Sequence, residues 1–149
     1  MGIIYEILKF LKAIFFGDKE LPDVKKPEDV ICMVDLTQCI NKFRLDHGLL
    51  PYFYLAPLED IAQEIANNNY RNGILISYID VSVMALKFRL KGIPEQPFAV
   101  ISLEGNDYKT DFCHKVVVEQ ANRHQLLDGF MNKIGMAKCG NYITIILTK

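Results

Sequence analysis

The chain of 149 residues lacks the features that mark several broad classes of protein. It has only nine glycines and six prolines, and its formal net charge is −1. Half of its residues are hydrophobic, which excludes disordered, collagenous and low-complexity classes because the chain has enough apolar surface to bury. The balanced charge provides no basic field for a phosphate backbone, so we expect no nucleic-acid partner. The length predicts one domain.

Signature motifs are also missing. Neither G-x-x-x-x-G-K-[ST] nor G-x-G-x-x-G occurs, and no internal repeat is visible. Cysteine is scarce and scattered, and no C-x-x-C pair occurs among Cys32, Cys39, Cys113 and Cys139. The even number allows two disulfides in any of three pairings, whereas reduced, buried thiols are equally compatible with the sequence. The sequence predicts no cofactor.

The N-terminal segment, residues 1–26, is expected to be an amphipathic helix over residues 1–16 followed by a charged linker. Glu6, Lys9 and Lys12 interrupt the apolar stretch, so it is too short and too charged to span a bilayer. Charges within the apolar stretch are atypical of a cleaved signal peptide, and Glu6 departs from the N-myristoylation pattern. Three interpretations stay open: a helix packed on the domain, an in-plane membrane anchor and an atypical secretory signal.

Helical spacing dominates the first half of the remaining chain, residues 27–149. We predict a helix over residues 27–46, because Pro27 suits a first helical position and Gly48 a position just past the end. An extended connection over residues 49–56 precedes a second helix, which begins at Pro57 and is expected to end at the asparagines 67–69. Its apolar positions form one stripe: Leu58, Ile61, Ala62, Ile65 and Ala66.

The second half changes to strand periodicity. Residues 74–79 are a candidate buried strand, and apolar residues alternate with polar ones over residues 84–91. This alternation predicts a half-exposed strand with a cationic strip on one face, made of Lys87, Arg89 and Lys91. A strand over residues 98–103, a helix over residues 111–127 and a terminal hairpin with a turn at Gly140 and Asn141 complete the prediction. Together the elements predict an α+β fold, a three-layer α-β-α sandwich with a mostly antiparallel sheet.

Several short motifs, taken in order, resemble the CAP superfamily of SCP-like proteins, which includes cysteine-rich secretory, antigen 5 and pathogenesis-related proteins. They are I-N-K-F-R at residues 40–44, H-G-L-L-P at 47–51, V-E-Q-A-N-R-H at 118–124 and I-G-M-A at 134–137, with Leu58, Ala62 and Ala66 in the second helix. The resemblance covers residues 30–149 and implies the same three-layer sandwich. It also implies secretion, whereas the N-terminus is a poor signal peptide, so the compartment stays open.

The family's cavity commonly holds two histidines and two acidic residues that bind a divalent metal in many members. By this resemblance His124 matches one histidine, and Glu104 lies near the expected acid. Residues 70–72 stand where the second histidine belongs, and Ala121 where the second acid belongs. A zinc site needs three or four ligands, so we predict a degenerate cavity that holds no metal.

The sequence therefore predicts a non-catalytic CAP-like binding module for a lipid, a membrane surface or a protein partner. The aromatic residues Tyr52, Phe53 and Tyr54 are candidates for a ligand groove and are equally suited to closing the core. The alternatives are a metal-assisted hydrolase that uses His124 and Glu104, and an intracellular α+β interaction protein unrelated to CAP.

Three further groups are expected to be architectural or incidental. Asn41 is expected to pin a loop, and Arg44 to pair with a helix carboxylate. The adjacent Cys113 and His114 point about 100° apart on a helix, which argues against a catalytic pair.

Overall fold

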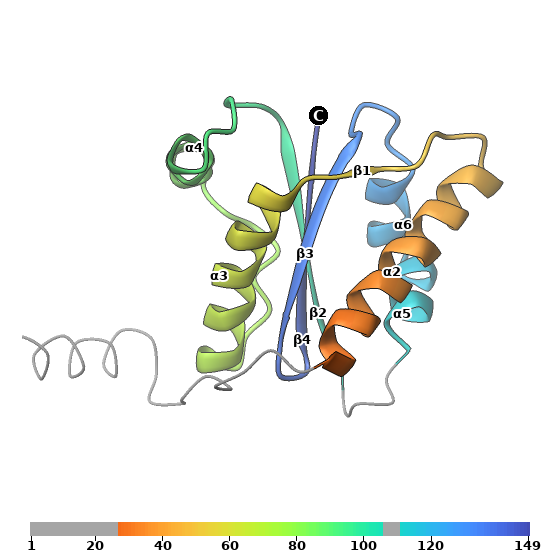
Figure 1. Cartoon of the computed structure of the whole chain (residues 1–149), viewed down its shortest axis with the longest axis horizontal. Helices are drawn as coiled ribbons and strands as arrows, with labels where there is room; N and C mark the ends of the chain where they lie inside the picture. The colour runs from red at the N-terminus through yellow and green to blue at the C-terminus, as the bar shows by residue number, and fades with distance from the viewer. Residues whose placement is uncertain (1–26, 106–110) are drawn as a thin grey trace, which may run out of the picture.

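A computed structural model describes residues 27–105 and 111–149, in which helices cover both faces of a four-stranded sheet (Figure 1). The elements in chain order are α2 (Pro27–Asp46), β1 (Phe53–Tyr54), α3 (Ala56–Asn72), α4 (Val81–Leu90), β2 (Phe98–Glu104), α5 (Phe112–Val118), α6 (Gln120–Leu126), β3 (Lys133–Cys139) and β4 (Tyr142–Thr148). The strand order is β1-β3-β4-β2, with β1 parallel to β3 and the other neighbours antiparallel. The predicted three-layer sandwich is confirmed. The predicted N-terminal helix and linker lie outside the described residues.

The sheet separates two apolar clusters. One lies between the sheet and the layer of α2, α5 and α6, and the other between the sheet and the layer of α3 and α4. Because successive strand residues point to opposite faces, Val100 and Ile101 of β2 enter different clusters. Helix α3 packs directly on β3, since a Cβ added to Gly135 would lie 2.4 Å from the Cβ of Leu58.

The sequence located α2, β2 and the terminal hairpin well, whereas α3 continues past its predicted end at residues 67–69. The five predicted stripe residues of α3 are all buried. The helix runs through the asparagines to Asn72 and ends at Gly73, whose φ of 63° is the left-handed conformation that glycine adopts readily. The glycine, and not the polar run before it, therefore ends the helix.

The predicted half-exposed strand over residues 84–91 is wrong, because this segment forms helix α4. Its apparent alternation also contains an i, i+4 pair, and only Met84 and Phe88 of the helix are buried. Asp80 caps the helix start by accepting a hydrogen bond from the Ser82 backbone N–H at 2.8 Å. The cationic strip is therefore also wrong: Lys87 and Lys91 lie one helical turn apart, facing α3.

The predicted buried strand over residues 74–79 is also wrong. The segment has no regular secondary structure, and side chains attach it to the sheet layer. The buried Asn69 accepts a hydrogen bond from the Ile76 N–H at 3.2 Å and donates one to Ser102 Oγ at 3.1 Å. The Ser102 hydroxyl in turn donates to the Ile76 carbonyl. The segment thus lies against β2 at residue 76 through side-chain contacts.

The single predicted helix over residues 111–127 is two short helices, α5 and α6. They are separated at Glu119, whose ψ of 120° is extended. Residues 116–118 are three consecutive valines, and β-branched side chains lower helix propensity. The break changes which residues point into the core. Phe112, Val116 and Leu126 are buried, whereas Val118 is exposed.

The contacts that α2 makes with nearby loops confirm the predicted role of Asn41 and correct that of Arg44. Asn41 Oδ1 accepts a hydrogen bond from the Tyr52 backbone N–H at 2.8 Å, so Asn41 pins the connection to β1 as predicted. Arg44 pairs with no carboxylate of the described residues. Its buried guanidinium donates to the carbonyl oxygens of Leu50, Leu126, Asp128 and Met131.

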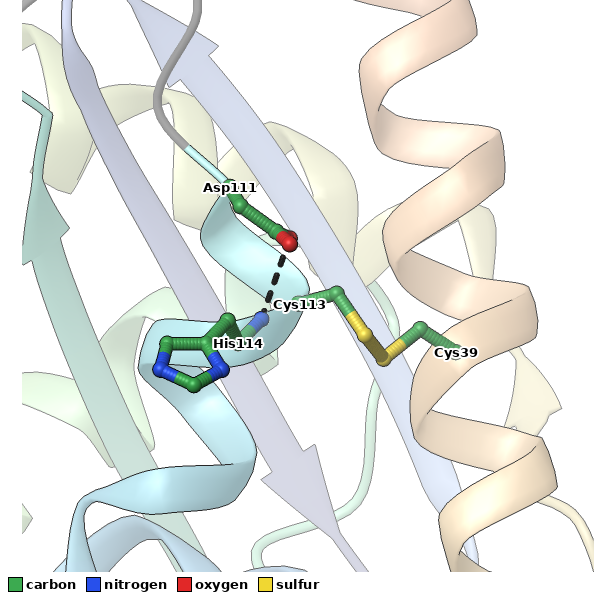
Figure 2. Close-up of a disulfide and its surroundings, with 4 residues drawn as sticks. All are labelled: Cys39, Asp111, Cys113 and His114. Atoms are coloured by element: carbon green, nitrogen blue, oxygen red, sulfur yellow. Dashed lines mark hydrogen bonds between the residues drawn. A yellow bond between two sulfur atoms is a disulfide. The ribbon is translucent and has the colours of Figure 1, made fainter.

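A disulfide joins Cys39 of α2 to Cys113 of α5, with 5.9 Å between the Cα atoms (Figure 2). Cys32 and Cys139 keep their thiols, so the chain combines both states that the sequence left open. In the part of the chain that the structure describes, no helix has the length and apolar character needed to span a bilayer.

Candidate functional site

The predicted cavity histidine lies on the surface. His124, on α6, is exposed and lines a hollow of about 460 Å³ together with Val118, Arg123 and Leu127. None of the described residues that line this hollow is acidic, and the Arg123 cation is one of its walls. This electrostatic environment disfavours a bound metal cation.

Glu104 lies elsewhere, at the end of β2. Its carboxyl group accepts a hydrogen bond from the Tyr142 hydroxyl, and burial together with this carboxylate raises the pKa of Tyr142. Among residues 27–105 and 111–149, no three His, Cys, Asp or Glu side chains lie close enough to hold a metal ion together. The described residues therefore do not fit the family's divalent metal. The roles of His124 and Glu104 in a ligand cavity stay predictions.

The aromatic groove candidates separate in the structure. Tyr52 lies in the core, where the Arg44 guanidinium stacks 3.8 Å from its ring centroid and its hydroxyl donates to the Leu126 carbonyl at 3.1 Å. Phe53 is 69 % exposed and Tyr54 is exposed at the edge of the sheet. Tyr52 thus closes the core, whereas a ligand role for Phe53 and Tyr54 stays a prediction.

The buried Tyr52 hydroxyl makes folding stability sensitive to alkaline pH. Burial raises the pKa of Tyr52 to about 12, although Arg44 opposes the shift. Between pH 10 and 12 the unfolded chain releases this proton while the folded chain retains it, so stability is expected to fall by about 2–3 kcal/mol across that window. Urea midpoints measured from pH 9 to 12 check this. Tyr52→Phe is expected to show a smaller alkaline loss, and an equal loss in both proteins would contradict the assignment.

The adjacent Cys113 and His114 do not form a catalytic pair. Cys113 is disulfide-bonded, whereas His114 is exposed and its backbone N–H donates to the capping carboxylate of Asp111 at 3.1 Å (Figure 2). The remaining thiol on α2, Cys32, has its pKa raised by burial and stays protonated at neutral pH. A protonated thiol is a poor nucleophile.

The structure adds a site that motif analysis did not find, a hollow of about 410 Å³ beside β2. We call it the β2 groove. Residues 77–79 and Val81 line one side, residues 96–100 line it at the start of β2, and Gln125 of α6 lines it from the opposite helical layer. None of these residues carries a formal charge, and Tyr78 and Val81 are 78 % and 59 % exposed at its rim. The groove is thus suited to an uncharged, largely apolar ligand.

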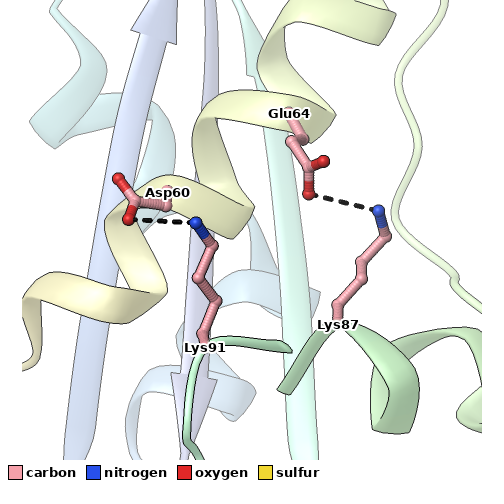
Figure 3. Close-up of polar contacts among 4 residues, drawn as sticks. All are labelled: Asp60, Glu64, Lys87 and Lys91. Atoms are coloured by element: carbon pink, nitrogen blue, oxygen red, sulfur yellow. Dashed lines mark hydrogen bonds and ion pairs between the residues drawn. The ribbon is translucent and has the colours of Figure 1, made fainter. Parts of the chain in front are cut away.

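The basic residues of α4, the helix that follows groove-lining residues 77–79 in the sequence, are partly neutralised. Lys87 pairs with Glu64 at 3.2 Å and Lys91, the C-cap residue of α4, with Asp60 at 3.3 Å, so the end of α4 is joined to two turns of α3 (Figure 3). All four side chains are partly exposed, and such pairs contribute little to stability. Their consequence is electrostatic, because α4 offers less free positive charge than its sequence suggests.

No protein-family model matches the sequence, and no curated protein matches it in sequence. Solved structures do match the fold. A cysteine-rich secretory protein from Staphylococcus aureus superposes with a TM-score of 0.69 at 16% identity, covering 87% of this chain and 42% of that one. An extracellular SCP-domain protein from Bacillus anthracis gives 0.70 at 12% identity, with 86% and 45% covered. An outer surface protein from Borrelia burgdorferi gives 0.68 at 14% identity, with 87% and 98% covered.

The chain therefore has the fold of CAP, or SCP-domain, proteins, which confirms the fold expected from the motifs. It spans less than half the length of the first two structures and nearly all of the third. At identities of 12–16% the likeness establishes the fold alone.

Proposed function

We propose that this chain is a non-catalytic binding domain that holds an uncharged, apolar segment of a protein partner in the β2 groove. The observation that carries the proposal is the groove itself, with its uncharged lining and its exposed apolar rim at Tyr78 and Val81. Exposed apolar side chains beside a preformed hollow are typical of interaction sites. The CAP-like fold is compatible with this role but does not specify it.

A protein segment is favoured over an anionic membrane surface for an electrostatic reason. Basic side chains near a bilayer each contribute about 1 kcal/mol to attraction toward anionic lipids. Lys87 of α4 and Lys91 at its C-cap are paired with carboxylates of α3, and none of the described residues that line the groove is a cation. A neutral segment that buries apolar side chains avoids the desolvation cost that charged groups would pay there.

The test uses a synthetic array of uncharged hexapeptides built from valine, isoleucine, phenylalanine, tyrosine, threonine and alanine. The strongest binder is then titrated against the full chain by fluorescence anisotropy. Tyr78→Asp places a charge at the rim and is expected to weaken binding at least tenfold, equivalent to about 1.4 kcal/mol. Leu90→Asp is the matched control, since Leu90 is 76 % exposed on α4 but does not line the groove. We expect its affinity to be unchanged.

Two parallel measurements address the other functions that the sequence allows. Vesicles of phosphatidylcholine, with and without phosphatidylglycerol, are sedimented with the full chain, and zinc is titrated into it by calorimetry. Vesicle binding without peptide binding would replace the proposal with a membrane role. Stoichiometric zinc binding that is lost in His124→Ala would favour the metal-assisted hydrolase. Absence of any peptide binding would overturn the proposal.

A further inference from the structure

Within residues 27–105 and 111–149, the backbone of β2 pairs with another strand on one edge only. β2 is the outer strand of the order β1-β3-β4-β2, next to β4. The N–H groups of Phe53 and Leu55 donate to the carbonyls of residues 132 and 134, so even-numbered residues of β3 face β1 and odd-numbered ones face β4. The odd-numbered residues of β3 lie opposite even-numbered residues of β4, so these residues of β4 face β3 and its odd-numbered residues face β2. The odd-numbered residues of β4 lie opposite odd-numbered residues of β2, which therefore face β4. The Gly105 N–H, which donates to the Asn141 carbonyl at 2.7 Å, follows the same parity.

The even-numbered residues of β2 therefore direct their N–H and C=O groups away from the sheet. Of these, Phe98 and Val100 line the β2 groove. Within the described part of the chain, no backbone hydrogen bond from residues 73–81 reaches either residue. Val100 is only 3% exposed. Buried backbone groups without partners are rare in folded proteins and cost about 1–3 kcal/mol each, so this edge has capacity for a partner that supplies hydrogen bonds.

The flanking layers restrict what that partner is. Residues 77–81 stand on the side of α3 and α4, and Gln125 stands on the side of α6. A second copy of this chain would bring its own helical layers against these walls when its β2 approached. A single extended segment carries no such layers and fits between them. Paired strands lie about 4.8 Å apart, so the segment would replace the missing neighbour of β2.

We infer that the β2 groove binds an extended, uncharged peptide segment by strand addition, with its backbone hydrogen-bonded to the outward groups of Phe98 and Val100. This inference rests on the proposed function and specifies its mode of recognition. Alternate side chains of the segment would point toward Tyr78 and Val81 on one wall and toward Gln125 on the other, as the period of two in a strand requires. The main chain would supply affinity, and the two walls would select side chains.

The decisive experiment uses the strongest array peptide and two N-methylated analogues of it. One analogue is methylated at the odd-numbered peptide bonds and the other at the even-numbered ones. In a strand only one of these sets faces β2, so one analogue is expected to bind at least tenfold more weakly and the other as well as the parent. Equal binding by all three peptides would overturn strand addition and leave the proposed function in place. Absence of binding by the parent peptide would overturn both.

Amide exchange in the full chain provides an independent measurement without any substitution. Adding the parent peptide is expected to slow exchange of the Phe98 and Val100 amides at least tenfold. The Ile101 amide, which faces β4, serves as the internal control and is expected to change little. Unchanged exchange at Val100 with the peptide bound would contradict the inference. A dimer in sedimentation experiments that the peptide dissociates would instead assign the edge to a second copy.

Discussion

Replacing Arg44 with alanine is expected to lower the free energy of unfolding by about 3–5 kcal/mol, one of the two largest effects that we expect in this protein. Arg44 is 3% exposed, and its guanidinium donates to carbonyl oxygens in the loop before β1 and in the region from α6 to β3. The shortest of these bonds, to Leu126, is 2.6 Å. Truncation would remove the guanidinium donor from the Met131 carbonyl, would leave the Leu126 carbonyl with the Tyr52 hydroxyl as its donor, and would remove the cation stacked on Tyr52.

The buried charge is stabilised without a carboxylate. Leu126 lies at the end of α6, where carbonyl groups lack helical partners and the helix dipole is negative. The planar guanidinium reaches several of these acceptors at once, which an ammonium group on a lysine does not. Arg44→Lys is therefore expected to lose about 2 kcal/mol despite keeping the charge.

Urea denaturation followed by circular dichroism measures both effects. Arg89→Ala is the matched control, since Arg89 is an exposed arginine on α4. Its unfolding free energy is expected to change by no more than about 0.5 kcal/mol. A loss below about 1 kcal/mol in Arg44→Ala would show that the carbonyl oxygens find other donors.

Removal of the disulfide between Cys39 and Cys113 is expected to cost about 4 kcal/mol. The bond joins residues separated by 74 positions, and the chain-entropy model gives roughly this cost for releasing so long a loop in the unfolded state. The folded state also depends on it, because α5 has only seven residues and a helix of that length is unstable alone. The bond fixes α5 against α2, and with it the start of the segment that leads to α6 (Figure 2).

The measurement compares urea midpoints of the wild type and of Cys39→Ala with Cys113→Ala, each with and without dithiothreitol. Reductant is expected to lower the wild-type midpoint to that of the double variant and to leave the double variant unchanged. Cys32→Ala, which removes a partly buried thiol that is not part of the bond, serves as the control. A wild-type midpoint that is insensitive to reductant would contradict the expected contribution.

The site was far less predictable than the fold. His124, Glu104 and the aromatic residues 52–54 were singled out by residue type and by resemblance, and none of them lines the β2 groove. The groove consists of apolar, hydroxyl and amide side chains from three separate segments, which carry no motif. The feature that points most directly to the groove is the order of the strands in the sheet, because an edge strand exposes alternate backbone groups whatever its side chains are.

Local physical chemistry determined much of this protein from sequence alone. Apolar spacing and Pro27 located α2, the five-residue stripe located the buried face of α3, and the two-residue turn located the hairpin of β3 and β4. Each of these signals lies within one element, where neighbouring residues alone set the backbone conformation. The motifs spread across the chain were sufficient to indicate the CAP-like fold.

Tertiary structure decided what depends on residues distant in sequence. Residues 84–90 fit both strand and helix periodicity, and burial of Met84 and Phe88 against the α3 side of the sheet selected the helix. One of the sequence-compatible cysteine pairs was brought together by the packing of α5 on α2. Arg44 found carbonyl oxygens more than 80 residues away in place of the expected carboxylate. In each case the sequence permitted more than one conformation or partner, and the packing of the helices on the sheet selected one of them.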